Sequence, residues 1–195
     1  MGLPSIRYPD GTEIAPQIDL CKALTLFAGV RPVRVKPGQR TPLNLPAGRE
    51  EDFVLIREST KGLFHTQRHG EVTATEARET LLITRDIPEK LFRFAFQLAH
   101  DRKAQWRGKG GVTCVDKANE FRAFAFFRSI FDEEAARHPD LVANHAYVDA
   151  TALWMVEKLR EFDVVVTENM FLITHEPQPV SAGDKAWAGF GRWPR

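Results

Sequence analysis

Three charged residues stand just after short apolar runs, and their type and position point to ligand binding. They are Arg57, Lys117 and Asp149, and the runs before them lie at residues 53–56, 112–115 and 146–148. Such runs are typical of buried β-strands. Ligands of open α/β sheets gather beyond the carboxyl ends of the strands. The pattern therefore makes these three residues the first candidates for ligand contact.

The same charges also have a structural interpretation. An aspartate side chain can accept hydrogen bonds from the free N–H groups at the start of a helix. Asp149 could cap a helix at residues 150–159, and Asp116 could cap one at residues 118–137. A charge that follows a strand is also commonly a solvated loop residue. Position alone leaves both interpretations open.

The elements that must position these residues alternate between strands and helices. Besides the three runs above, strands are predicted at residues 30–35 and 162–167, with further β structure at 71–85. Helices are predicted between Pro16 and Pro32, where Gly29 would end the helix, and at residues 87–103, 117–137 and 150–159. This alternation predicts an α/β domain.

Local signals add detail to these elements. Asp86-Ile87-Pro88-Glu89 matches a capping box with proline in the first turn, which predicts the start of the helix at 87–103. Cys114 lies inside a predicted strand, so we expect an inert core residue. The predicted core stripe of the helix at 117–137 consists of four phenylalanines: Phe121, Phe124, Phe127 and Phe131.

Composition limits the class of protein. Of 195 residues, 43% are hydrophobic and 27% are charged, which is ordinary for a folded domain and excludes a disordered chain. The 27 basic and 26 acidic side chains nearly balance, so no nucleic-acid or membrane partner is expected. No apolar stretch reaches membrane-spanning length, and the N-terminus lacks an apolar signal core. With two cysteines, Cys21 and Cys114, we expect a reducing, cytoplasmic location.

Four segments occur in an order that matches a known family: Val54–Leu63, Val115–Asn119, Tyr147–Ala150 and Phe162–Phe171. Together they closely resemble the isocitrate/isopropylmalate/tartrate dehydrogenases, which are metal-dependent, NAD(P)-dependent decarboxylating dehydrogenases of 2-hydroxy acids. Four ordered motifs are far more specific than one. The resemblance covers about residues 1–171 and implies an isopropylmalate-dehydrogenase-like α/β fold.

The resemblance implies a role for five residues. Arg31 and Arg57 match two substrate-binding arginines, and guanidinium groups bind carboxylates bidentately. Asp149 matches an aspartate ligand of Mg²⁺ or Mn²⁺, an ion that would chelate the substrate hydroxyl and carboxylate. Lys117 matches the lysine that takes the hydroxyl proton while hydride passes to NAD. Asn119 matches an asparagine close to the substrate and the nicotinamide.

The resemblance also implies how many chains build a site. In this family the matched lysine and aspartate reach the active site of the other subunit, so a homodimer with shared active sites is expected. The expected substrate is a 2-hydroxy acid such as tartrate, malate or 3-isopropylmalate.

The chain departs from the family pattern at three places. Cys21 stands where the family has another substrate arginine, and Phe64 stands where it has a catalytic tyrosine. After Phe171 the family has Gly-Asp and then Ser-Asp, which supply two metal carboxylates, whereas this chain has Leu-Ile-Thr-His-Glu-Pro. Mg²⁺ held by Asp149 alone would bind weakly, since hard cations need several oxygen ligands.

The matched region resembles mainly the inserted domain of the family, which carries the dimer interface and a protruding β arm, expected here at about residues 65–85. We therefore interpret residues 1–171 as a partial dehydrogenase domain, truncated at both ends, and residues 172–195 as a divergent, irregular tail. Two functions follow. One is an NAD-dependent, Mg²⁺- or Mn²⁺-dependent 2-hydroxy acid dehydrogenase, and the other is a catalytically inactive remnant that acts as a dimerisation module.

Overall fold

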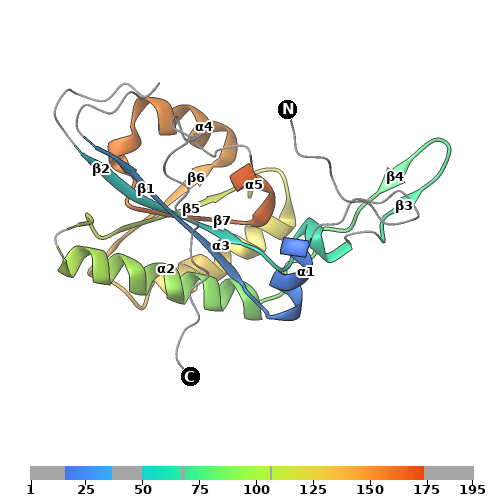
Figure 1. Cartoon of the computed structure of the whole chain (residues 1–195), viewed down its shortest axis with the longest axis horizontal. Coiled ribbons are helices and arrows are strands. Elements are labelled where there is room, and N and C mark those ends of the chain that lie inside the picture. The colour runs from blue at the N-terminus through green and yellow to red at the C-terminus, as the bar shows by residue number, and fades with distance from the viewer. Residues whose placement is uncertain (1–15, 37–49, 67–68, 106, 174–195) are drawn as a thin grey trace.

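The computed structural model describes residues 16–36, 50–66, 69–105 and 107–173. Its central feature is a five-stranded sheet in the order β1-β2-β7-β5-β6 (Figure 1). The strands are β1 (Ala28–Val35), β2 (Glu51–Glu58), β5 (Gly111–Asp116), β6 (Val142–Tyr147) and β7 (Val164–Thr167). β2, β7, β5 and β6 run parallel, while β1 pairs antiparallel with β2 at one edge. The predicted α/β class is confirmed.

Two long helices, α2 (Asp86–Ala104) and α3 (Arg122–Ala135), cover one face of the sheet (Figure 1). Both are amphipathic and turn their apolar sides toward the strands. The ring of Phe92 lies 4.7 Å from that of Phe127 and 5.3 Å from that of Phe131, in edge-on contacts between the two helices. Burying a side chain of this size contributes about 1.5–3 kcal/mol, so this cluster holds both helices on the sheet.

The opposite face is covered by α4 (Val148–Glu157) and the short 3₁₀ turn η2 (Leu159–Glu161) (Figure 1). Successive residues of a strand point to opposite faces, so the continuous apolar runs of the sequence supply a second core here as well. Its buried members are Phe53, Leu55, Val115, Ala146, Met155, Leu159, Phe162 and Val165.

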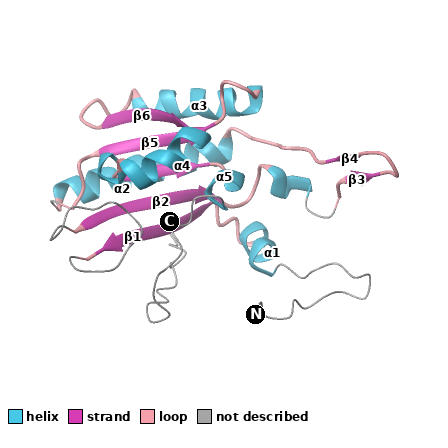
Figure 2. Cartoon of the chain, turned by 90° about the horizontal axis from the view of Figure 1, so that it is seen from above, coloured by secondary structure: helices cyan, strands magenta, loops and turns pink. Residues whose placement is uncertain are grey.

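A two-stranded hairpin, β3 (Glu71–Val72) and β4 (Ala77–Arg78), projects from the body within the arm predicted at 65–85 (Figure 2). Residues 81–84, predicted as β structure, form no strand. Leu82 instead makes an isolated bridge to Gly62, with backbone hydrogen bonds in both directions. This part of the prediction is wrong because these backbone groups close the base of the arm rather than extend a ladder.

The helix predicted at 117–137 begins later than expected. Asp116 accepts hydrogen bonds from the N–H of Ala118 and from the guanidinium of Arg128, and these bonds hold a turn ahead of α3. Asp116 is therefore not the predicted helix cap. Phe121 precedes the helix and is 56% exposed, so it does not belong to the core stripe, whereas the other three phenylalanines are buried as predicted.

The starts and ends of other helices also differ from the predictions. α1 (Pro16–Ala23) ends before Gly29, which lies in β1. α2 lacks the predicted capping box, because its N-cap residue is Arg85 and no side chain caps it. Arg85 instead pairs with Glu133 of α3 at 2.6 Å.

The last described element is α5 (Asn169–Ile173), and from residue 174 on the predicted tail lies outside the described residues. Among the helices described, none has the length and apolar character needed to cross a membrane.

Candidate active site

The carboxyl ends of the parallel strands meet at one edge of the sheet. Arg57 lies near the end of β2, opposite Thr167 of β7. Lys117 directly follows β5, and Asp149 lies in the first turn of α4, directly after β6. The three residues predicted for ligand contact therefore lie along the same edge.

Arg31 and Arg57 come together on β1 and β2. Arg57 pairs with Gly29, two residues before Arg31, so both arginine side chains stand on the same face of the sheet. Burial, and then the positive charge of Arg31, lower the pKa of Arg57. The buried Nε of Arg57 has no hydrogen-bond partner among the described residues.

Two departures from the family pattern border the same arginine. Arg57 Cζ lies 5.1 Å from the centroid of the Phe64 ring, which is a cation–π contact. Cys21 is buried near Arg57. Burial raises the pKa of the Cys21 thiol, and the positive charge of Arg57 partly opposes this by lowering it. Both departures thus reduce the polar groups available next to Arg57.

A buried acidic cluster that the sequence pattern does not predict lies near Arg57. Glu58 accepts hydrogen bonds from the N–H and hydroxyl of Thr60, at 2.6 and 2.7 Å, and from the amide of Asn169, at 3.1 Å. Glu168 is 1% exposed. Burial, with a smaller contribution from the negative charge of Glu58, raises the pKa of Glu168 to about 7. One signal was available, since Glu168 directly follows an apolar strand, as Arg57 does.

Lys117 and Asp149 form an ion pair. Lys117 Nζ donates to Asp149 Oδ1 at 2.9 Å, and this hydrogen bond lowers the pKa of Asp149. Asp149 is therefore not engaged as the predicted helix cap; the N-cap of α4 is Tyr147. Asn119 lies in the turn after Lys117, is exposed, and donates to Glu120 at 3.3 Å.

The structure does not bring the arginine pair and the Lys117–Asp149 pair together. β7 lies between β2, which carries Arg57, and β5, which Lys117 follows. In the described part of the chain, no hydrogen bond or ion pair joins Lys117 or Asp149 to either arginine. The predicted site residues thus form two separate groups at one sheet edge.

A divalent cation at Asp149 would need more ligands than the described residues supply there. Mg²⁺ takes about six oxygen ligands in octahedral geometry. Within the described ranges, three metal-ligating side chains gather at one place only, and that group does not include Asp149. These residues alone therefore do not fit Mg²⁺ or Mn²⁺, and Asn119 alone does not make a nicotinamide site.

The sequence of this chain matches a known protein family. A profile of isocitrate/isopropylmalate dehydrogenases matches residues 4–172. The chain belongs to the isocitrate/isopropylmalate dehydrogenase family. The resemblance stated from the four ordered motifs is confirmed.

Relatives within the isocitrate/isopropylmalate dehydrogenase family are similar over most of this chain. The 3-isopropylmalate dehydrogenase of Listeria monocytogenes is 39% identical over 155 residues, which are 78% of this chain and 42% of that enzyme. The 3-isopropylmalate dehydrogenase of Staphylococcus saprophyticus is 32% identical over 173 residues, or 88% of this chain and 48% of that enzyme. The chain spans about half the length of the curated relatives it matches.

A solved family structure has the same fold. The isocitrate dehydrogenase from Methylococcus capsulatus superposes with a TM-score of 0.71 at 30% identity, covering 87% of this chain and 49% of that one. The predicted isopropylmalate-dehydrogenase-like fold is confirmed at the level of this family.

Proposed function

We propose that the chain acts as an oxidoreductase on a 2-hydroxy acid such as 3-isopropylmalate, malate or tartrate, with NAD and Mg²⁺ or Mn²⁺ as cofactors. Arg31 and Arg57 bind a substrate carboxylate, and Lys117 accepts the hydroxyl proton. Asp149 would supply one ligand to the metal, whose other ligands would have to come from outside the described residues, and Asn119 would line the nicotinamide site. Membership of a dehydrogenase family supports the reaction class.

The environment of Arg57 carries this proposal. Its guanidinium is half-buried, lies beside the charge of Arg31, and has a buried Nε with no hydrogen-bond partner among the described residues. An anion bound here would relieve the repulsion between the two cations and satisfy the free donor. The planar fork of an arginine fits a carboxylate through two parallel hydrogen bonds.

The proposed proton transfer by Lys117 requires that its ion pair with Asp149 opens. The Nζ of Lys117 is engaged with Asp149 Oδ1 at 2.9 Å. It becomes a base only when that pair opens. Because β7 separates this pair from the arginines, we place the two halves of one complete site on different subunits of a homodimer.

Formation of NADH tests the proposal. Purified chain is supplied with NAD, Mn²⁺ and each of the three acids, and Lys117→Met is compared with Lys109→Met, a change at an exposed lysine. We expect turnover with at least one acid, a loss of about 100-fold or more in Lys117→Met, and no change in Lys109→Met. No turnover above the blank with any acid would overturn the enzymatic function.

A second candidate function is a dimerisation module without catalysis. The outward side of α4 carries two large apolar side chains, Leu153 (55% exposed) and Val156 (50% exposed), spaced three residues apart. Residues at this spacing are neighbours on a helix surface, so the two side chains form one apolar patch that a protein partner would cover. The family resemblance implies a homodimer, so a second copy of the chain is the partner proposed for this surface.

A further inference from the structure

A cysteine, an aspartate and a histidine lie together on one face of the sheet, away from the arginine pair. Cys114 and Asp116 are two residues apart on β5, so they point to the same face. His145 of β6 lies directly opposite Cys114 in the register of the parallel strands. The sheet itself therefore brings the three side chains together.

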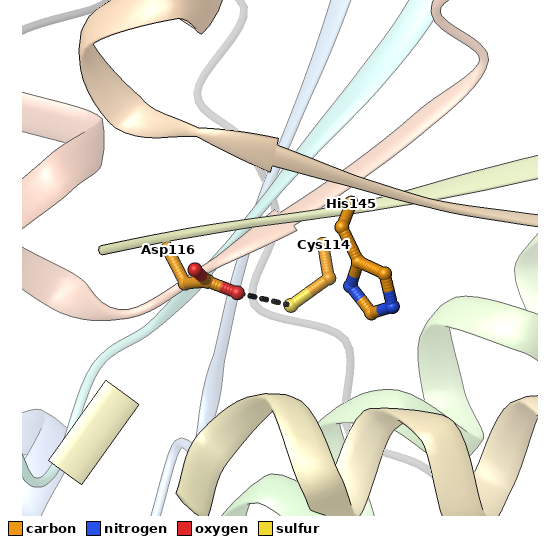
Figure 3. A group of neighbouring side chains, drawn as sticks. All are labelled: Cys114, Asp116 and His145. Atoms are coloured by element: carbon orange, nitrogen blue, oxygen red, sulfur yellow. Dashed lines mark hydrogen bonds between the residues drawn. The ribbon is translucent and has the colours of Figure 1, made fainter. Parts of the chain in front are cut away.

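Their ligating atoms are close enough to surround one ion. The thiol, a carboxylate oxygen and an imidazole nitrogen all lie within 4.8 Å of one another. Cys114 Sγ lies 3.8 Å from Asp116 Oδ2, and one ring nitrogen of His145 faces that sulfur while the other points away (Figure 3). Neighbouring ligands of a tetrahedral zinc ion lie about 3.3–3.7 Å apart, so closure of about 1 Å would suffice.

The histidine is oriented as a metal ligand is. His145 Nε2 lies 2.8 Å from a carboxylate oxygen of Asp132 on α3. When Nε2 donates to Asp132, the lone pair of Nδ1 faces Cys114. Metal-ligating histidines regularly donate their other N–H to a carboxylate, which fixes the tautomer and the ring.

Charge and access also suit a divalent cation. Two carboxylates, Asp116 and Asp132, stand against one guanidinium, that of Arg128, which binds Asp116 at 2.6 and 2.8 Å. A cation of charge +2 that displaces the thiol proton of Cys114 would bring this group to neutrality. Cys114 and Asp116 are fully buried, while the side chain of His145 is 34% exposed and leaves a route from solvent.

We propose that Cys114, Asp116 and His145 form a binding site for a borderline-soft divalent cation such as Zn²⁺, with Sγ, a carboxylate oxygen and Nδ1 as ligands. A thiolate and an imidazole select ions of this class over Mg²⁺. Binding releases the thiol proton, so affinity rises with pH. This site is separate from Asp149 and does not depend on the proposed dehydrogenase activity.

Cobalt substitution tests the site without any activity assay. Co²⁺ is titrated into the metal-free chain, and a thiolate-to-cobalt charge-transfer absorption is expected to saturate at one equivalent and to vanish on addition of Zn²⁺. Cys114→Ser should abolish the band. Asp132→Asn, a change at an exposed residue, should weaken binding by about 10–100-fold.

Matched variants distinguish this site from adventitious binding. Cys21→Ser removes the other cysteine, and His65→Gln removes an exposed histidine outside the cluster; both should keep the band unchanged. His145→Gln alters a partly exposed residue and should reduce the affinity even if Cys114→Ser fails to fold. No band in the wild-type chain, a band that survives Cys114→Ser, an unchanged affinity in His145→Gln, or a band lost in Cys21→Ser would overturn the proposal.

Discussion

The ionisation of Glu168 should affect stability between acidic and neutral pH. Its carboxyl is buried near Glu58, and burial raises its pKa from 4.5 to about 7. Below about pH 7 the folded chain therefore keeps the Glu168 carboxyl protonated. In the unfolded chain the same carboxyl ionises above about pH 4.5. The stabilisation from this proton is fully present below about pH 4.5 and is lost as the pH rises through about 7.

Replacing Glu168 by glutamine should remove this pH dependence, because glutamine keeps the shape without the titration. The free energy of unfolding of the wild-type chain, relative to that of Glu168→Gln, should fall by about 3 kcal/mol between pH 4.5 and pH 8. Urea unfolding at several pH values measures the difference. Parallel pH profiles for the two chains would contradict the buried titration.

Residue types and strand ends predicted where Arg57, Lys117 and Asp149 lie, and the family resemblance added Arg31. The metal-ligating group at Cys114 could not be predicted in the same way. His145 meets Cys114 through the register between two strands, and hydrophobic pattern alone does not specify that register. The strand pattern predicts a core residue at Cys114, and the residue is fully buried in the core; the pattern does not predict its neighbours Asp116 and His145.

Arg102, near the end of α2, links this helix to the amino end of β2 and to the residue just before β7. Its guanidinium is buried and binds Asp163 Oδ1 at 2.7 Å and Asp52 Oδ1 at 2.8 Å. Asp163 also accepts the N–H of Gly110 at 2.8 Å. One cation thus fixes α2, the amino end of β2 and the turn before β5.

Arg102→Met should destabilise the chain by about 3–5 kcal/mol, because it leaves Asp163 buried without its cation. Arg93→Met, at an exposed arginine of the same helix, should change the free energy of unfolding by no more than about 0.5 kcal/mol. Thermal or urea unfolding measures both variants. Equal stabilities would show that Arg102 does not hold these elements together.

Periodicity predicted the strands of the sheet and the body of each long helix. It failed at the start of α3, where a bond between Asp116 and Arg128, twelve residues apart, replaces the first expected turn. It failed again at residues 81–84, where Leu82 pairs with Gly62 across the base of the arm. Both errors come from contacts distant in sequence, which a local pattern does not contain.

At the scale of the whole molecule, the exposed apolar side of α4 should determine the oligomeric state. The double change Leu153→Glu and Val156→Glu should convert a dimer to a monomer, because it places charges in the proposed interface. Arg93→Glu, at an exposed residue of α2 on the opposite side of the sheet, is the control and should stay dimeric. Sedimentation equilibrium distinguishes the two states, and a dimer unaffected by the double change would place the interface elsewhere.

Titration calorimetry with 3-isopropylmalate tests whether the arginine pair binds the carboxylate of a 2-hydroxy acid. Binding to the wild-type chain should weaken by about 10–100-fold in Arg57→Gln, since a hydrogen bond to a charged group contributes about 1.5–3 kcal/mol. Arg57→Lys should fall between the two, because it keeps the charge and loses the fork. Arg93→Gln should bind like the wild type. No binding by the wild-type chain, or equal affinity in Arg57→Gln, would show that the arginine pair does not bind the carboxylate.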